Sequence, residues 1–310
     1  MTAIDQIMAA KGLVLPDVVT GYIGAESLPI DPRANQLALH FPGTGEQLTL
    51  LQEDDAKTVA RAVACARDSF QTGAWSRTAT AARQGVFRRG ATLIREHAEE
   101  LALLECLCAG LPAAHLASRQ VPRAADNLDF FADYIAVMAG ETFEQMSGYQ
   151  TTVTRQPAGV AALFAPWNAP LALASMQIAS SLAFGNTCVL KPSEHTPLSI
   201  LRMVSLLEEA GLPPGVLNTV NGYGHDAGKR LTEHPAIKAI AFVGESRTGS
   251  IITKQGADTL KRMHLELGGK NPVIVFDDAD LERALDAVIF MIYSINGERC
   301  TSSSRLLIQD

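Results

Sequence analysis

The chain has 310 residues, of which 47% are hydrophobic and 19% charged, and its formal net charge is −7. This composition excludes intrinsic disorder and predicts a globular protein with a sizeable core, of roughly two domains at about 100–200 residues each. The negative charge argues against nucleic acid as a partner, because phosphates require a basic surface.

The N-terminal part of the chain is predicted to be mainly helical after a start of short strands and loops. Residues 1–55 contain turn formers and few periodic patterns. Apolar residues then recur at helical spacing, and the second helical stretch stops at Gly110, a common helix terminator. The polar, β-prone segment 140–156 predicts a two-stranded hairpin. The first predicted helical stretch begins at Asp55, the second covers about residues 78–108, and the third covers about residues 121–138.

The central part alternates short apolar strands with helices. The alternation begins after Gly159 and indicates a parallel sheet with helices on both faces. Such sheets bind ligands at the carboxyl ends of their strands, so we expect a ligand crevice in the loops that follow them. The predicted strands end at Phe164, Leu190, Val220 and Val243, and the predicted helices between them cover about residues 171–184 and 197–210.

The last part of the chain predicts two more strands, a helix and a final strand. The helix begins near Asp280 and carries its apolar residues on one face. The predicted strands are residues 263–267, 273–276 and 306–308. The chain stops directly after the final strand, which is an unusual place for a fold to finish.

The cysteines and the apolar runs indicate where the protein resides. The five cysteines are an odd number and lack the spacing of common zinc sites. No apolar run of about 18 residues predicts a transmembrane helix, and the start at Met1 lacks the order of a signal peptide. We therefore expect a cytoplasmic protein with free thiols, no bound metal and no membrane partner.

Two segments that follow buried strands have both an ordinary and a functional interpretation. Asn168 is either a turn former beside proline or an amide donor aimed at a developing oxyanion. Lys191 and Glu194 are either a solvated ion pair or a pair that binds ribose hydroxyls. In the second case a carboxylate near the 2′-hydroxyl favours NAD over NADP, because it would repel a 2′-phosphate.

Two glycine-containing loops also follow strands. The loop at 242–249 leads into a helix whose N-terminus can present amides to a pyrophosphate. The loop at 222–228 lacks the G-x-G-x-x-G spacing, so a bare turn is the favoured interpretation there.

Two segments nearer the C-terminus carry candidate reactive groups. Glu266 in an alternating strand normally faces solvent, whereas burial would raise its pKa and suit a general base. Cys300 follows Arg299 in a polar turn. It is either a small buried hydrophobe or, beside a positive charge or an amide dipole, a nucleophile.

Taken together, in this order and spacing, these segments resemble the NAD(P)-dependent aldehyde dehydrogenase family over nearly the whole chain. The stretches that carry the resemblance are PWNAP, KPSE, FVGESRTG, LELGGKNP and NGERCTSSSR. The resemblance implies that Cys300 attacks the aldehyde carbon. It also implies that Asn168 and the Cys300 backbone N–H hold the oxyanion, and that Glu266 activates water to hydrolyse the thioester.

The resemblance implies NAD as the cofactor, with NADP less expected, and a small-molecule aldehyde as the substrate. Glu245 stands where many relatives have Ser, so its carboxylate would have to point away from the phosphates. The residues implied to contact the cofactor are Ala165, Trp167, Lys191, Ser193, Glu194, Gly224, Gly228, Phe242, Gly244, Glu245, Ser246, Gly249 and Leu267.

The family resemblance also implies a domain organisation. The expected fold is α/β, with a parallel Rossmann-type sheet in an NAD-binding domain made of residues 1–139 and 157–267. Residues 140–156 are expected to form an oligomerisation hairpin, and residues 268–310 the beginning of a second α/β catalytic domain. Family members continue well beyond this length, so we expect a C-terminally truncated chain. The homodimer or homotetramer of the family is then in doubt.

Several stretches, among them 122–124, 130–132 and 278–287, look like the 5-carboxymethyl-2-hydroxymuconate semialdehyde dehydrogenase branch. That branch serves aromatic catabolism, and its substrates carry carboxylates. Three functions stay open at this point. The chain is a hydrolytic aldehyde dehydrogenase of this or another branch, an acylating dehydrogenase that passes the thioester to coenzyme A, or a non-catalytic binding or structural protein or inactive fragment. Glu266 argues against the second, because it can activate water.

Overall fold

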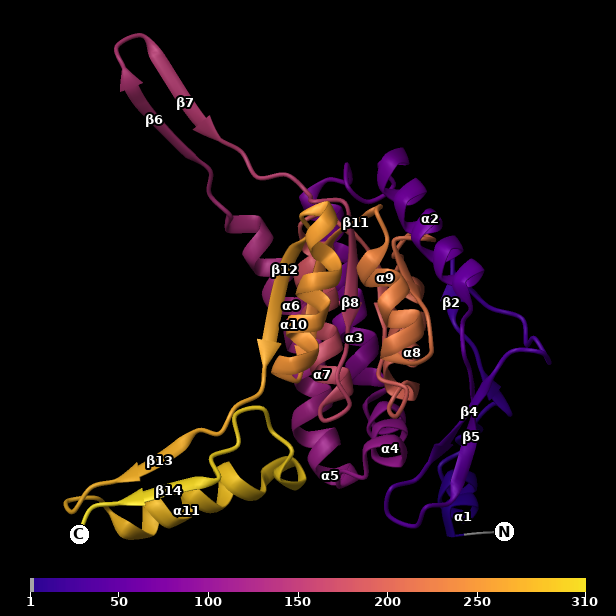
Figure 1. Ribbon diagram of the computed structural model, residues 1–310, viewed down its shortest axis with the longest axis vertical. Coiled ribbons are helices and arrows are strands. Elements are labelled where there is room, and N and C mark those ends of the chain that lie inside the picture. Colours follow the sequence, from indigo (N-terminus) through magenta and orange to yellow (C-terminus); the bar gives the residue numbers. More distant parts are fainter. Residues whose placement is uncertain (1–2) are drawn as a thin grey trace.

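The computed structural model describes residues 3–310 and has a seven-stranded sheet at its centre (Figure 1). The strand order is β12–β11–β8–β9–β10–β2–β3. The strands from β12 to β10 are parallel, which confirms the predicted parallel sheet, while β2 and β3 add an antiparallel edge that was not predicted. The strands are β2 (Tyr22–Ile23), β3 (Glu26–Ser27), β8 (Val160–Phe164), β9 (Thr187–Lys191), β10 (Leu217–Thr219), β11 (Ile237–Gly244) and β12 (Arg262–Leu267).

Different helices cover the two faces of the sheet. One face packs against α3 (Thr80–Glu96), α6 (Val121–Val137), α7 (Pro170–Ala183) and α8 (Leu198–Glu209). The other face packs against α2 (Ala56–Thr72), α9 (Lys229–Glu233) and α10 (Ser246–Gly256). Along β8, Leu163 belongs to the first core and Ala162 and Phe164 to the second. A strand buried on both sides has a continuous apolar sequence, which is why β8 could be predicted to the residue.

The predicted helices are confirmed with one interruption. The single helix expected over 78–108 is two helices, α3 and α4 (Ala98–Ala109), because His97 leaves helical geometry at φ −95° and ψ 22°. Gly110 ends α4 in the left-handed conformation at φ 68°, where glycine has no steric penalty. Asp55 caps α2 by accepting the N–H of Thr58. The short helix α1 (Ala3–Ala10) lies in the segment expected to hold only strands and loops, so that prediction was wrong there.

Smaller elements surround the sheet. A three-stranded sheet, the hairpin predicted over 140–156 and a parallel strand pair lie outside it. The three-stranded sheet has the order β1 (Val18–Val19), β5 (Gln47–Gln52), β4 (Gln36–His40). The hairpin consists of β6 (Glu141–Met146) and β7 (Tyr149–Val153), and the parallel pair of β13 (Pro272–Val275) and β14 (Arg305–Ile308). The remaining helical segments are α5 (Ala113–His115), η1 (Leu116–Gln120), η2 (Gly224–Gly228), η3 (Ala257–Thr259), α11 (Leu281–Tyr293) and η4 (Ser294–Gly297).

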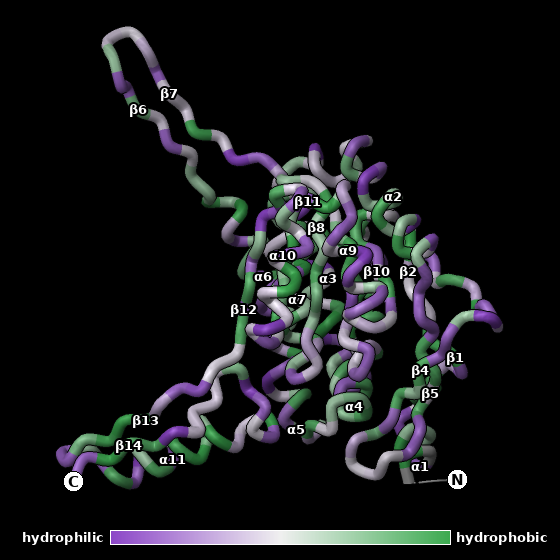
Figure 2. Tube along the Cα trace, viewed as in Figure 1, coloured by the Kyte–Doolittle hydropathy of each residue, from purple (hydrophilic) through white to green (hydrophobic). Residues whose placement is uncertain are grey.

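Two segments project from the sheet body (Figure 1). One is the β6–β7 hairpin, and the other, here called the C-terminal arm, is residues 268–310 with β13, β14 and α11. Hydrophobic stretches alternate with hydrophilic ones along the arm (Figure 2), and no residue of α11 is buried. Within residues 3–310, no helix combines the length and the hydropathy needed to cross a membrane.

Candidate active site

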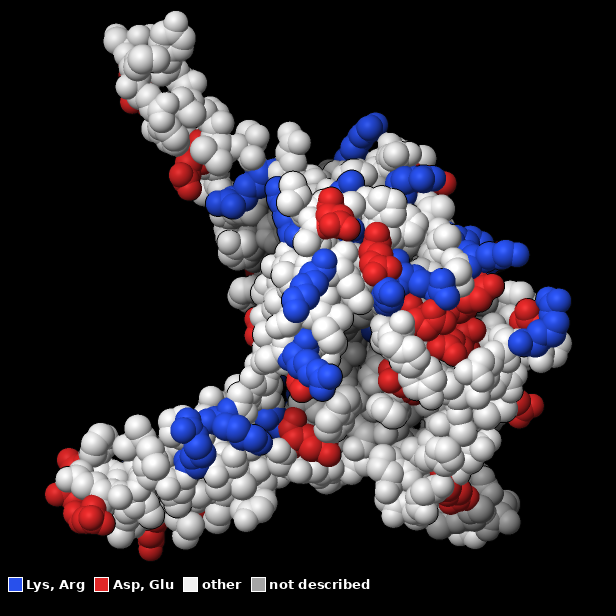
Figure 3. All heavy atoms as spheres, in the orientation of Figure 1, with Lys and Arg blue, Asp and Glu red and all other residues white. Residues whose placement is uncertain are grey.

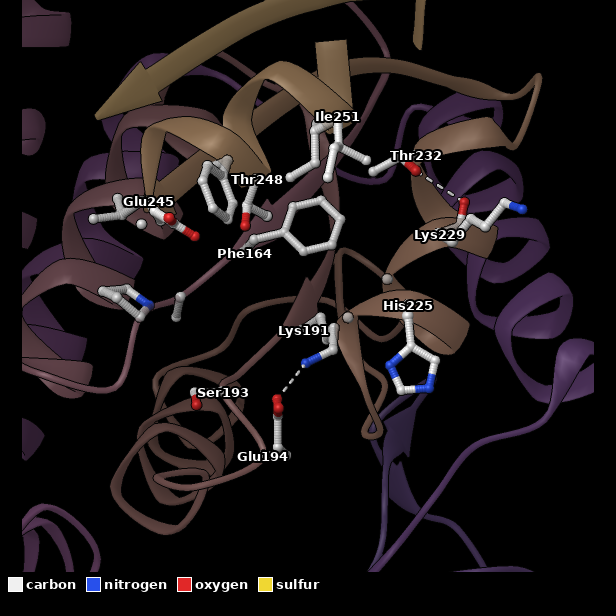
Figure 4. Close-up of a pocket in the computed structure, with 18 of the residues that line it drawn as sticks. Phe164, Lys191, Ser193, Glu194, His225, Lys229, Thr232, Glu245, Thr248 and Ile251 are labelled. Atoms are coloured by element: carbon white, nitrogen blue, oxygen red, sulfur yellow. Dashed lines mark hydrogen bonds and ion pairs between the residues drawn. The ribbon is translucent and has the colours of Figure 1, made fainter. Parts of the chain in front are cut away.

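A cavity of about 640 Å³ lies at the carboxyl ends of β8, β9 and β11 (Figure 4). The loops that follow these strands meet there, as the sequence predicted. Most of the residues expected to contact the cofactor line this cavity, namely Ala165, Trp167, Lys191, Ser193, Glu194, Gly224, Gly228, Phe242, Gly244 and Glu245. Ser246, Gly249 and Leu267 do not line it. A methyl group placed on Gly249 would lie 3.0 Å from Leu267 Cδ2, so these two residues pack on each other behind the cavity.

Lys191 is a buried cation held at the end of β9. Its side chain is 5% exposed, and its Nζ lies 2.9 Å from the Pro192 carbonyl and 3.3 Å from Glu194 Oε2 (Figure 4). Burial lowers the pKa of Lys191 below its usual 10.5, and the Glu194 carboxylate opposes that change. The interpretation as a solvated ion pair is therefore wrong for Lys191. The pair presents a donor and an acceptor to the same cavity.

The loop at 222–228 is not the bare turn that was favoured. Gly224–Gly228 form a π-helical turn that leads into α9, and both glycines line the cavity. A methyl group on Gly224 would meet open space, and one on Gly228 would lie 3.6 Å from Phe164. Glu53 Oε1 accepts the N–H of Tyr223 at 3.1 Å and helps to hold this turn in place.

Helix α10 begins at the rim of the cavity. Its N-cap is Glu245, which makes no capping hydrogen bond, so the first amides of α10 have no side-chain partner. Free amides at the positive end of a helix form an anion site. Thr248, within the predicted 242–249 segment, lines the cavity, and so does Ile251 one turn further along α10, which was not predicted although its helical spacing from Thr248 was visible in the sequence. His225 was missed too, and no sequence signal marks it.

A second cavity of about 350 Å³ brings Asn168 and Cys300 together. Asn168 Nδ2 donates to the carbonyl of Glu298 at 2.7 Å, so Asn168 is bonded to the loop that carries Cys300 and is more than a turn former. The amide keeps a second N–H for another acceptor. The cavity is also lined by His115, Arg119, Gln120, Arg123, Ala169, Leu173, Phe290, Ser294, Ile295, Arg299 and Thr301.

The loop before Cys300 has an unusual backbone. Ile295, Asn296 and Gly297 are all left-handed, with φ of 54°, 54° and 75°. This conformation is strained for a β-branched residue such as Ile295, and strain of this kind gathers at functional sites. Arg299 Nη1 bonds to Ser294 Oγ at 3.0 Å, and its guanidinium lies 4.9 Å from the centre of the Phe290 ring.

Among the cysteines in the described residues 3–310, Cys300 differs from the others in its exposure to solvent. Cys300 is exposed, whereas Cys108 and Cys188 are buried, and burial raises the pKa of both of these thiols to about 12. The interpretation of Cys300 as a small buried hydrophobe is therefore wrong. An exposed thiol in a cavity that Arg119 and Arg123 also line is accessible to a small substrate.

Glu266 lies apart from both cavities, and its carboxyl group faces solvent, as is ordinary for an alternating strand, and is not buried as the functional interpretation required. Its side chain is 55% exposed, with Oε1 3.4 Å from His264 Nε2. The reason is the position of β12 at the sheet edge. Leu265 and Leu267 face α10 near Gly249, so alternation places Glu266 and His264 on the face of β12 that nothing covers.

The doubly covered parallel sheet, with one cavity at its strand ends and a second around an exposed cysteine, defines an α/β protein of the dinucleotide-fold class. Residues 30–310 match the aldehyde dehydrogenase family model, and the chain belongs to this family.

The chain is similar to the 5-carboxymethyl-2-hydroxymuconate semialdehyde dehydrogenase of Escherichia coli, with 42% identity over 86% of this chain and 56% of the relative. It is 41% identical to the NADP/NAD-dependent aldehyde dehydrogenase PuuC of Escherichia coli K12, over 87% of this chain and 55% of the relative. Among solved structures, HpcC of Thermus thermophilus superposes with a TM-score of 0.91 at 42% identity, over 99% of this chain and 58% of the other. The chain thus spans about half the length of the curated relatives it matches.

Proposed function

We propose that the protein oxidises an aldehyde to a carboxylic acid with NAD, through a covalent adduct on Cys300. The observation that carries this proposal is the shared cavity of Cys300 and Asn168. Consecutive residues line the two cavities, because Trp167 lines the one at the strand ends and Asn168 the one around Cys300.

The residues of the first cavity fit a nicotinamide dinucleotide. Lys191 and Glu194 offer a donor and an acceptor to ribose hydroxyls, and the free amides that begin α10 suit a pyrophosphate. The Glu194 carboxylate favours NAD, because it would repel the 2′-phosphate of NADP. When bound, the dinucleotide supplies the hydride acceptor.

The second cavity supports nucleophilic catalysis. The Cys300 thiolate attacks the aldehyde carbon and forms a thiohemiacetal. The Asn168 amide and the Cys300 backbone N–H stabilise its oxyanion. Loss of a hydride from the adduct carbon leaves a thioester on Cys300. Glu266 is the candidate base for the hydrolysis of this thioester by water. Its position outside the cavity keeps open the alternative in which coenzyme A takes the acyl group.

The basic lining of the second cavity favours an aldehyde that also carries a carboxylate. His115, Arg119 and Arg123 follow one another at intervals of four residues along a helical run and line the cavity with Cys300. Within residues 3–310, neither arginine lies within ion-pair distance of a carboxylate, whereas Arg95 pairs with Asp126 at 2.8 Å. A guanidinium without a partner suits bidentate binding of a carboxylate. A semialdehyde of aromatic catabolism is such a substrate, and it agrees with the name of the relative from Escherichia coli.

The projecting hairpin supports self-association into a homo-oligomer. Phe143, Met146 and Tyr149 are exposed on β6 and β7. The outer part of the hairpin carries few charged side chains in Figure 3, whereas acidic and basic side chains are interspersed over the sheet body. Exposed apolar residues on a projecting hairpin are typical of a protein interface.

The test uses the protein as its gene encodes it, with reduction of NAD followed in the presence of aldehydes with and without a second carboxylate. We expect turnover, with kcat/KM at least about tenfold higher for the carboxylated aldehyde, the effect of about one charged hydrogen bond. An Arg119→Met variant should lose that preference, while Arg77→Met, on a surface away from both cavities, should keep it. Free acid as the product supports hydrolysis and acyl-CoA supports the alternative. Failure to reduce NAD with any aldehyde contradicts the proposal.

A further inference from the structure

The carboxyl group of Glu105 joins three helices behind the two cavities. Glu105 belongs to α4 and is 1% exposed. Its Oε2 accepts the N–H of Leu171 on α7 and the hydroxyl of Ser199 on α8, each at 3.0 Å. Within residues 3–310, its Oε1 is buried without a hydrogen-bond partner. A buried carboxyl group with an unused oxygen opposes folding, so its presence calls for a functional explanation.

Glu105 caps the start of α7 from a different helix. The N-cap of α7 is Ala169, which has no capping side chain, and Pro170 has no N–H to donate. The N–H of Leu171 is therefore the first amide donor of α7, and Glu105 takes it. A carboxylate at this end also interacts favourably with the helix dipole. Asn168 lies three residues before Leu171, so this bond fixes the segment from which the Asn168 amide projects.

The same carboxyl group also touches the helix behind the cofactor segment. Ser199 lies in the first turn of α8, which follows the segment that carries Lys191 and Glu194. Glu105 therefore links the elements behind both cavities. The bond to Leu171 holds the segment that Asn168 connects to the Cys300 loop, through the 2.7 Å bond between Asn168 Nδ2 and the Glu298 carbonyl.

We propose that Glu105 is a positioning residue that holds the Asn168 amide in register with Cys300 by fixing the first turn of α7. This inference rests on the proposed function, in which Asn168 stabilises the oxyanion. The ionised form of Glu105 holds α7 more tightly than the acid form, because hydrogen bonds to a charged acceptor are stronger.

Glu105 changes its charge near neutral pH. Burial raises the pKa of Glu105 to about 7, and its hydrogen bonds to Leu171 and Ser199 limit the rise. Residues 170–183 of α7 contain no titratable side chain. The titratable and charged groups on the elements packed around Glu105 and α7 are Glu99, Glu100, Cys106 and Cys108 on α4, Arg83, Arg88, Arg89, Arg95 and Glu96 on α3, Arg202, Glu208 and Glu209 on α8, His115 on α5, Arg119 on η1, Arg123, Asp126, Asp129, Asp133 and Tyr134 on α6, His40 on β4 and Lys191 on β9. As the pH falls through about 7, Glu105 takes up a proton, its hold on α7 weakens, and kcat should fall.

The test compares Glu105→Gln with Glu100→Gln in the protein as its gene encodes it. Glu100 is the matched control, because it lies on the same helix but pairs with Arg202 at 2.8 Å and contacts neither cavity. For Glu105→Gln we expect kcat to fall about tenfold with KM for the aldehyde within about twofold, the pattern of a displaced catalytic group. The limb of the kcat–pH profile near pH 7 should disappear in Glu105→Gln and persist in Glu100→Gln. An unchanged kcat, or a limb that persists in Glu105→Gln, would overturn the proposal.

Ser199→Ala keeps the proposal testable where Glu105→Gln does not fold. It removes one of the two bonds that hold down the pKa of Glu105, so the limb should move to higher pH and kcat should fall about threefold. An unmoved limb with unchanged kcat overturns the proposal. If the parent protein oxidises no aldehyde, the proposed function fails by itself, and amide exchange decides about Glu105. Faster exchange of residues 165–173 in Glu105→Gln than in Glu100→Gln supports the positioning role, and equal exchange contradicts it.

Discussion

The two cavities are built in different ways, although the consecutive residues Trp167 and Asn168 line one each. The cavity at the strand ends is formed by loops of a sheet that is packed on both faces, and its Lys191 is buried. The cavity around Cys300 has one wall from the same body and one from the C-terminal arm, whose α11 has no buried residue. Binding groups are thus held by a rigid scaffold, while the reactive thiol lies on a segment with little packing of its own. Changes to the arm should affect chemistry more than stability, and changes to the core of the body should do the reverse where they do not displace Asn168.

The largest effect is expected from the thiol itself. Cys300→Ala should lower kcat/KM by at least about 10³-fold, because the covalent route is lost. The free energy of unfolding should change by less than about 0.5 kcal/mol, because Cys300 is exposed. Steady-state kinetics and urea unfolding measure the two quantities. A loss of less than about tenfold in activity would remove the covalent role, and Cys106→Ala is the control cysteine that should leave kcat unchanged.

Asn168 tests the wall that the body contributes to the reactive cavity. Asn168→Ala should lower kcat about 10²-fold, the usual effect of removing one oxyanion donor. KM for the aldehyde should change much less, because the amide acts mainly in the transition state. Asn186→Ala is a suitable control, since its amide bonds to Ala158, Gly159 and Ser181, which line neither cavity. A rise in KM with unchanged kcat would assign Asn168 to substrate binding instead.

A pair of leucine substitutions compares the two regions directly in stability. Leu163 on β8 is 1% exposed and Leu285 on α11 is 59% exposed. Leu163→Ala should lower the free energy of unfolding by about 3 kcal/mol, the middle of the range for buried leucine, and Leu285→Ala by less than about 0.5 kcal/mol. Urea unfolding of the 310-residue chain measures both. Equal losses would mean that the arm is as tightly packed as the body, and the contrast would fail.

The smallest effect concerns how the stability of the body depends on pH. Asp54 is 2% exposed, and burial raises its pKa to about 7 from the usual 3.8. Between these values the folded protein binds more protons than the unfolded chain, so the contribution of Asp54 to stability falls as the pH rises from about 4 to about 7. Asp54→Asn should reduce this loss by on the order of 2 kcal/mol. Urea unfolding at pH 5 and pH 8 checks it, and the same loss in parent and variant would contradict it.

The two regions also differ in how well their sequences predict them. Strand β8 and the hairpin 140–156 were predictable because each has a local pattern, a continuous apolar run in one and β-prone polar residues in the other. The break between α3 and α4 at His97 was not predictable, because the apolar residues continue across it at helical spacing. The exposure of Glu266 depends on β12 being an edge strand, and strand order is a property of the whole chain. The partnership of Asn168 with Cys300 came from the family resemblance, since the two residues are far apart in sequence.

The hydrogen bond from Asn168 to the Glu298 carbonyl links the two regions close to the reactive thiol, and Asn296 Nδ2 adds a second bond, to the Gly110 carbonyl at 3.4 Å. The Asn168 bond connects a loop of the rigid body to the strained turn of Ile295 and Asn296 that leads to Cys300. No local sequence pattern could have predicted this bond, because it forms across the chain between two loops. The family motifs contain both Asn168 and Glu298, and the structure shows the hydrogen bond between them.

The most direct test of the covalent mechanism is to trap the acyl group on the enzyme. Protein mixed with aldehyde and NAD is quenched with acid within milliseconds, digested, and analysed by peptide mass spectrometry. The peptide that contains Cys300 should carry the mass of the acyl group, formed at the rate of the first turnover. Turnover without label on Cys300, or label on one of the other four cysteines, would contradict the account.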